Sequence, residues 1–156
     1  METLTPDNAG VRFPPPLIYL LVFLAGWAIQ RVDPITLLPG GESRVAALVC
    51  VVAAVVVFGW AALSLRRHRT SIVPVRPTAA LVIEGPYRIT RNPLYLGLVL
   101  LYAGVAFWLD ALWPLVLLPV LVFVIQLYAI RREERYLERR FGEEYRAYTR
   151  RVRRWI

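Results

Sequence analysis

The chain has 156 residues, 58% of them hydrophobic, and carries a formal net charge of +8. This apolar fraction exceeds that of ordinary soluble domains, and it argues against a disordered polar chain, a disulfide scaffold and a coiled-coil fibre. Cys50 is the only cysteine, so no disulfide or metal site can be built from it. The composition therefore predicts a single polytopic membrane domain.

Four stretches of 18 to 21 residues contain no charged side chain. As helices they would extend roughly 27 to 32 Å, enough to cross the hydrocarbon core of a bilayer. Asp110 lies in a connection so short that the last two stretches must form an antiparallel hairpin. We therefore predict an all-α, polytopic integral membrane protein, a single domain over 1–156, with spans at about 14–30, 44–65, 93–109 and 111–130, a loop over 66–92 and a helical tail over 131–156.

The basic residues predict the orientation. With these four spans, all but two of the 19 arginines, Arg31 and Arg44, lie on one side of the membrane. By the positive-inside tendency, both termini, the 66–92 loop and the tail are expected in the cytoplasm, with the spans in the inner membrane. The arginines cluster beside the spans, so membrane lipids are the expected partners, and nucleic acid is not. Arginine without any lysine also suggests a GC-rich, bacterial genome.

The tail after Ile130 is expected to continue the fourth helix out of the membrane. Ile130, Leu137 and Phe141 are apolar among charged neighbours, a pattern typical of an amphipathic helix, which Gly142 would end. A second short helix is expected from Glu143.

The sequence contains none of the familiar soluble catalytic patterns. It has no metal-ligand cluster, no catalytic triad, no phosphate-binding loop and no dinucleotide fingerprint, so no metal is expected. The four spans contain no acid or base that would support a proton relay or ion pathway. Any site is therefore expected at the cytoplasmic membrane face.

Two segments at that face carry unusual chemistry. The first, 85–97, places two X-Pro turns, arginines and tyrosines at the entrance of a helix, and the helix amides with these arginines suit a carboxylate or phosphate. The second contains Glu133 and Glu134, which could hold an ammonium or sulfonium group. From the residues alone, the first is equally consistent with a basic turn carrying interfacial tyrosines. For the second, a solvated helix with Glu–Arg pairs is the simpler alternative.

Together the two segments resemble the membrane-embedded methyltransferases that include isoprenylcysteine carboxyl methyltransferase and the phospholipid methyltransferases. The resemblance extends from about Thr70 to Arg154, a little over half of the chain. The motifs that carry it, in chain order, are Gly85 to Tyr87, Arg91 to Gly97, Glu133 to Leu137, Phe141-Gly142, Tyr145 with Tyr148, and Arg151-Val152.

The resemblance implies methyl transfer from S-adenosylmethionine to a lipophilic acceptor that enters from the bilayer. It also implies a cofactor pocket that is reached from the cytosol, and in this pocket we predict an in-line displacement at the sulfonium methyl. The implied cofactor-binding residues are Tyr87, Arg91, Asn92, Pro93, Tyr95, Gly97, Glu133 and Glu134. The implied catalytic or acceptor-binding residues are Arg91, Glu134, Arg151 and Arg154.

The chain departs from the family pattern at two positions. Asn92 stands where many members have histidine, so no imidazole base is available there. Arg153 occupies the place of a proline that commonly follows the Arg-Val pair, which leaves the roles of Arg151 and Arg154 open.

The acceptor is predicted from the shortage of bases. A carboxylate acceptor is already ionised near neutral pH, whereas a phospholipid ammonium must first lose a proton. Lysine is absent and His68 is the only histidine. An isoprenylcysteine-like carboxylate is therefore the first predicted acceptor, and a phosphatidylethanolamine-type amine is the second. For the amine, Glu133 or Glu134 could act as the base. The alternative of another class is a non-enzymatic membrane protein that binds anionic lipid or a partner.

Overall fold

The computed structural model describes residues 10–11, 13–38, 41–70 and 80–156, and within these ranges the regular elements are all helices. The predicted all-α fold class is confirmed. Residues 71–79 of the predicted 66–92 loop lie outside the described residues. In chain order the elements are α1 (Pro15–Val32), α2 (Glu42–Arg67), the 3-10 helix η2 (Gly85–Arg88), α3 (Pro93–Trp108), α4 (Leu112–Ile125), the π-helical turn η3 (Gln126–Ile130), α5 (Arg131–Phe141) and α6 (Glu143–Arg151).

Three helices of the described chain are long and apolar enough to cross a membrane: α1, α2 and the continuous helix Leu112–Phe141 formed by α4, η3 and α5. The third predicted span forms α3, a shorter apolar helix of 16 residues, or about 24 Å. The apolar part of the Leu112–Phe141 helix ends at Ile130, where Arg131 and Arg132 begin a charged extension. The chain is thus an integral membrane protein with a polar extension at one end.

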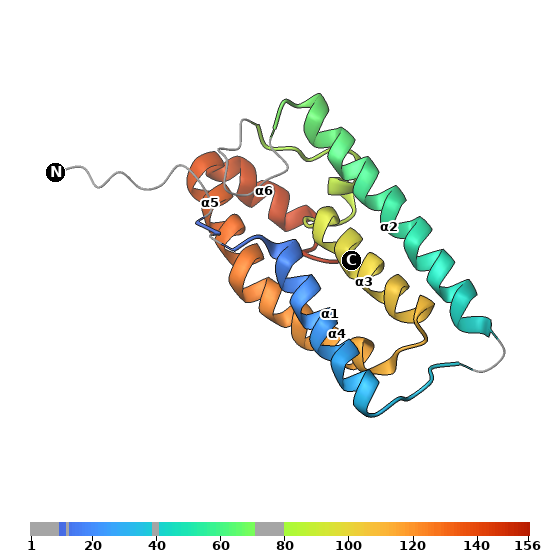
Figure 1. Ribbon diagram of the computed structural model, residues 1–156. Helices are drawn as coiled ribbons and strands as arrows, with labels where there is room; N and C mark the ends of the chain where they lie inside the picture. Colours follow the sequence, from blue (N-terminus) through green and yellow to red (C-terminus); the bar gives the residue numbers. More distant parts are fainter. Residues whose placement is uncertain (1–9, 12, 39–40, 71–79) are drawn as a thin grey trace.

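The long helices pack as two pairs, α2 with α3 and α1 with α4 (Figure 1). Ala47, Ala54 and Ala61 form a buried stripe along α2. Gly104 of α3 lies so close that a Cβ atom would be 2.8 Å from the side chain of Val51. Small residues allow this close approach between helices inside a bilayer.

Aromatic side chains of α1 and α3 join the two pairs. The Tyr102 hydroxyl donates a 2.9 Å hydrogen bond to the carbonyl of Pro114, and its ring meets Tyr19 and Phe23 edge-on. Polar groups within the bundle are thereby satisfied by protein partners, as an apolar surrounding requires.

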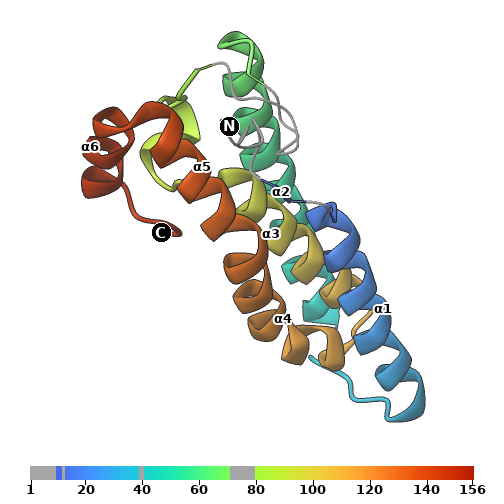
Figure 2. The same ribbon diagram turned by 90° about the vertical axis from the view of Figure 1, so that its left-hand side faces the viewer.

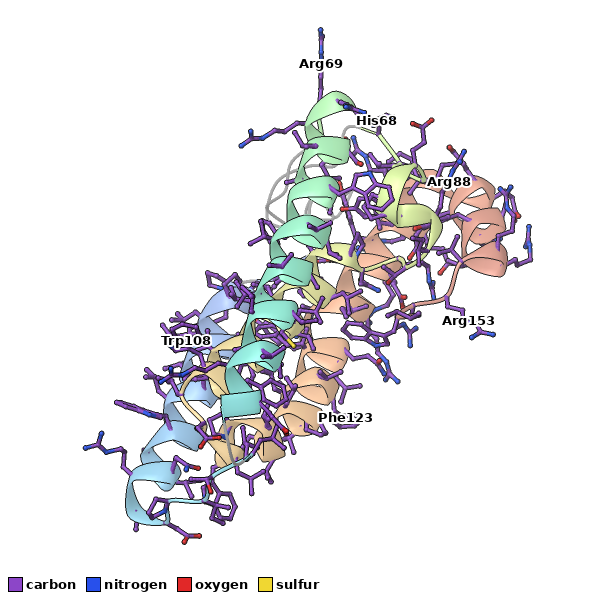
Figure 3. The ribbon with its side chains drawn as sticks, turned by 90° about the vertical axis from the view of Figure 1, so that its right-hand side faces the viewer. His68, Arg69, Arg88, Trp108, Phe123 and Arg153 are labelled. Carbon is purple, nitrogen blue, oxygen red and sulfur yellow. The ribbon has the colours of Figure 1, made fainter. Side chains whose placement is uncertain are left out.

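The outer surface of the bundle exposes large apolar side chains, including Val45, Val49, Val52 and Val55 of α2. Phe123 of α4 projects outward in the same manner (Figure 3). Such a surface suits lipid rather than water. Charged side chains gather instead at one end of the bundle, where Arg69, Arg88 and Arg153 are labelled in Figure 3.

A tight turn joins α3 to α4, and two short helices follow the last long apolar stretch. Asp110 forms a tight turn with φ of 49° between α3 and α4, and its carboxylate accepts a 3.0 Å hydrogen bond from the amide of Leu37. Gly142, with φ of 53°, ends α5 and precedes α6. After α6 the chain turns back toward the long helices (Figure 2). The tail is therefore packed against the bundle rather than extended from it.

Candidate active site

The segment before α3 is held against the end of α2. Gly85 has φ of +61°, and a Cβ atom there would lie 2.6 Å from the Ser64 hydroxyl oxygen and 2.9 Å from the Trp60 indole nitrogen. Only glycine combines this backbone conformation with such a close approach. η2 follows, and Pro93 occupies the first turn of α3, where its missing N–H costs nothing. These features place Tyr87 and Arg91 beside the C-terminal helices.

Glu134 of α5 joins two arginines from different parts of the chain. Arg154 donates two hydrogen bonds to its carboxylate, from Nε at 2.9 Å and from an Nη atom at 2.7 Å. The guanidinium of Arg91 lies 3.2 Å from the same carboxylate, and the side chains of Arg91 and Glu134 are only 15% and 16% exposed. The pair with Arg154 is bidentate and therefore directional, although the Arg154 side chain is 33% exposed. The Arg91–Glu134–Arg154 cluster therefore connects the two motif segments.

The chain after α6 also binds the entrance of α3 through its backbone. The Arg91 amide donates a 3.0 Å hydrogen bond to the carbonyl of Arg153. The carbonyl of Arg154 accepts from the Thr90 hydroxyl at 3.1 Å and from the Asn92 side-chain amide at 2.9 Å. Asn92 thus acts here as a hydrogen-bond donor to the tail, a role that needs no titrating group.

Glu133 lies apart from the arginine cluster. Its carboxylate accepts a short hydrogen bond from the Tyr95 hydroxyl, and no described residue forms an ion pair with it. Tyr95 is also bound by a residue of α1: the Tyr19 hydroxyl donates a hydrogen bond to the Tyr95 carbonyl at 3.4 Å. The adjacent glutamates consequently have different surroundings: one is neutralised by arginines, and the other faces a phenol.

Three tyrosines outside the spans complete the polar wall. The Tyr148 hydroxyl donates a 2.7 Å hydrogen bond to the carbonyl of Tyr87. Burial raises the pKa of the Tyr145 phenol to about 12, with a further contribution from Glu134 and opposition from Arg91. Burial likewise raises the pKa of Tyr87 and Tyr148. All three remain neutral phenols near pH 7, so they offer hydrogen bonds without charge.

A cavity of about 440 Å³ lies between these groups, within the size range of small-molecule and cofactor sites. One side is polar, and the other is formed by apolar residues of α1, α2 and the segment before η2. It is lined by seven of the eight predicted cofactor-binding residues: Tyr87, Arg91, Asn92, Pro93, Tyr95, Glu133 and Glu134. Apolar lining residues include Pro14, Phe58, Leu65, Leu81, Val82 and Leu137.

Three predicted site residues lie outside the cavity lining. Gly97 faces α2, where a Cβ atom would be 3.1 Å from the Cβ of Phe58. Arg151 is exposed and bonds within α6, its Nε donating to the carbonyl of Ala147 at 3.3 Å. Arg154 reaches the site through Glu134. Gly97 thus packs helices together, and of the two tail arginines only Arg154 joins the site.

The apolar wall and Thr90 were not among the predicted site residues. Phe58, Leu81 and Val82 come from stretches whose composition is that of any span or connector, so no motif marked them. Thr90 lies inside the motif segment and is 2% exposed, but its hydrogen bond to the tail depends on tertiary structure.

The residues present fit a ligand that carries both charges and an apolar body. Arg91 supplies a cation whose Nε is buried without a hydrogen-bond acceptor in the described part of the chain. The free amides at the start of α3 add positive potential, and Glu133 supplies an acidic group. S-adenosylmethionine, with a carboxylate, an ammonium and a sulfonium, matches this set.

The sequence is similar to those of known proteins. The family model described as phospholipid methyltransferase matches residues 43–144. A Haemophilus influenzae protein described as uncharacterized is 40% identical over 63 residues, which is 40% of this chain and 100% of that protein. No solved structure matches the chain.

Proposed function

Because the chain belongs to the phospholipid methyltransferase family, we propose that it transfers a methyl group from S-adenosylmethionine to the headgroup of a membrane lipid. One observation carries this proposal: a single cavity is lined by both motif segments and by apolar residues of α1 and α2. A polar donor and an oily acceptor can therefore meet in the same space.

The bound cofactor would supply an electrophilic methyl group on its sulfonium. Arg91 and the first amides of α3 are the groups suited to its carboxylate. Glu134 is a positioning residue, because it holds Arg91 in place through the same carboxylate that binds Arg154. Tyr87 and Tyr148 border the site as neutral phenols, and Arg151, at the surface, receives no role.

The protein's contribution to catalysis is positioning in a space with little water. Apolar walls from Phe58, Leu65 and Val82 exclude solvent from one side of the cavity. Holding a nucleophile and a methyl group aligned in such a space removes much of the entropic barrier to a bimolecular reaction.

Of the two acceptors, the amine headgroup of a phospholipid is supported better than an isoprenylcysteine carboxylate. Arg91 is assigned above to the carboxylate of the cofactor, and Arg154 is held by Glu134, so neither is left to neutralise an acceptor carboxylate. Glu133 offers an acidic group to an ammonium, either that of the cofactor or that of the acceptor. In the second case its carboxylate would take the proton of the acceptor ammonium, so that the nitrogen lone pair attacks the sulfonium methyl and S-adenosylhomocysteine leaves. The family description points to phospholipid as well.

Labelled methyl transfer tests the acceptor. Purified protein in lipid nanodiscs would receive radiolabelled S-adenosylmethionine with either phosphatidylethanolamine or a farnesylcysteine analogue. We expect the label in the phospholipid. Label in farnesylcysteine alone would reverse the ranking, and label in neither would remove both acceptors.

We also propose that this site faces the cytoplasm, because the arginines concentrate at the end of the bundle that contains it. Cysteine residues introduced at the exposed positions Arg88 and Arg150 should react with a membrane-impermeant thiol reagent only after the inner side is opened. Reaction in sealed, right-side-out vesicles would overturn this orientation.

A further inference from the structure

A π-helical turn lies between the apolar part of the last long helix and the two glutamates. η3 occupies Gln126–Ile130 and leads directly into α5. A π-turn contains one more residue than an α-helical turn, so side chains beyond it are rotated by about 100° around the helix axis. The direction in which Glu133 and Glu134 point therefore depends on this turn.

The first residue of the π-turn is bound by the folded-back tail. The Trp155 indole N–H donates a 3.0 Å hydrogen bond to the Gln126 side-chain oxygen. The Trp155 ring also packs against the buried cluster that contains Ile125, Ala129 and Ile130. Neither Gln126 nor Trp155 lines the cavity.

The same short segment binds the opposite wall of the site. Arg153 and Arg154 accept hydrogen bonds through their carbonyls from Arg91 and Asn92, and the Arg154 side chain holds Glu134. Residues 153–155 thus connect the entrance of α3, the carboxylate of α5 and the π-turn above it.

We propose that Trp155 and Gln126 are positioning residues of the methyl-transfer site. Their hydrogen bond holds the π-turn and so keeps both glutamates of α5 facing the cavity. The link to cofactor binding rests on the proposed function, whereas the effect on the helix does not. Gln126→Leu removes the hydrogen bond at similar side-chain volume, Trp155→Phe removes the donor with a smaller aromatic ring, and Gln126→Glu retains an acceptor oxygen.

Hydrogen exchange of full-length protein in detergent, measured without cofactor, tests the effect on the helix. Amides of residues 127–135 should exchange at least about fivefold faster in Gln126→Leu and Trp155→Phe, the effect of one lost hydrogen bond. They should exchange at the wild-type rate in Gln126→Glu. Phe123→Leu, on the exposed face of α4, is the matched control. Wild-type exchange in both Gln126→Leu and Trp155→Phe would overturn the proposal.

Binding of S-adenosylhomocysteine tests the consequence for the site. Its affinity should fall about fivefold in the two variants that lose the hydrogen bond, and it should keep the wild-type value in Gln126→Glu. Unchanged affinity in both variants, with a wild type that binds, would overturn the positioning role. If the wild type itself did not bind, the proposed function would fail, and the exchange comparison would still decide whether the hydrogen bond holds the helix.

Discussion

Arg154, which follows α6, donates two hydrogen bonds to Glu134 of α5, and the same carboxylate contacts Arg91 at the entrance of α3. Removing one member of a buried ion pair leaves its partners desolvated and uncompensated, which costs far more than the pair itself contributes. The arrangement makes Glu134 the residue through which both motif segments are joined.

Replacing Glu134 should therefore impair cofactor binding. We expect Glu134→Ala to weaken S-adenosylhomocysteine affinity at least about tenfold, or about 1.4 kcal/mol, because Arg91 loses the group that orients it. Titration calorimetry measures the effect. The matched control is Glu144→Ala, an exposed glutamate of α6, which should bind normally. Equal affinities in the two variants would show that the cluster does not position the binding group.

Two measurements on one variant show whether Glu133 binds the ammonium group of the cofactor or that of the acceptor. If it binds the cofactor, Glu133→Gln should weaken S-adenosylhomocysteine binding about tenfold, since a charge-assisted contact is lost. If it serves the acceptor, that affinity should stay at the wild-type value, while kcat/KM for phosphatidylethanolamine falls. The pair of measurements assigns the role. A variant normal in both would exclude Glu133 from the site's chemistry.

Asn92 should matter as a donor to the tail. Asn92→Ala removes the hydrogen bond to the carbonyl of Arg154 and should reduce the free energy of unfolding by about 1 kcal/mol. Asn92→His keeps a ring N–H that can donate and should retain more of that stability. Thermal unfolding in one detergent compares them. Identical melting temperatures for Asn92→Ala and wild type would contradict this role.

Helix packing can be tested apart from the site. A Cβ atom at Gly104 would lie 2.8 Å from Val51 and 3.3 Å from the carbonyl of Ala47, whereas at Gly59 it would meet no atom within 4 Å. Gly104→Ala should destabilise the protein by roughly 1–3 kcal/mol through overpacking. Gly59→Ala should be neutral or slightly stabilising. Equal melting temperatures for Gly104→Ala and Gly59→Ala would contradict the close packing of α2 against α3 at Gly104.

Much of this architecture could be predicted from the sequence. The uncharged stretches indicated the helices, and the hairpin at Asp110 and the break at Gly142 followed from local chemistry. The ordered motifs predicted that the entrance of α3 and the glutamates of α5 share one site, and both line one cavity.

The remaining features depend on contacts between distant residues. The side of α3 on which Gly97 lies is decided by the neighbouring helix, because an almost uniformly apolar helix carries no periodic signal for its orientation. No residue pattern distinguishes the π-turn at Gln126 from an ordinary α-helix. The pairing of Arg154 with Glu134 requires the tail to fold back onto α5. Local patterns contain no information on any of these three.

Binding of S-adenosylhomocysteine by the purified protein tests the central claim most directly. Calorimetric titration should give saturable binding for wild type and for Arg88→Ala, whose side chain is exposed on η2, and at least about tenfold weaker binding for Arg91→Ala. Absence of saturable binding by the wild type, or wild-type affinity in Arg91→Ala, would contradict the account.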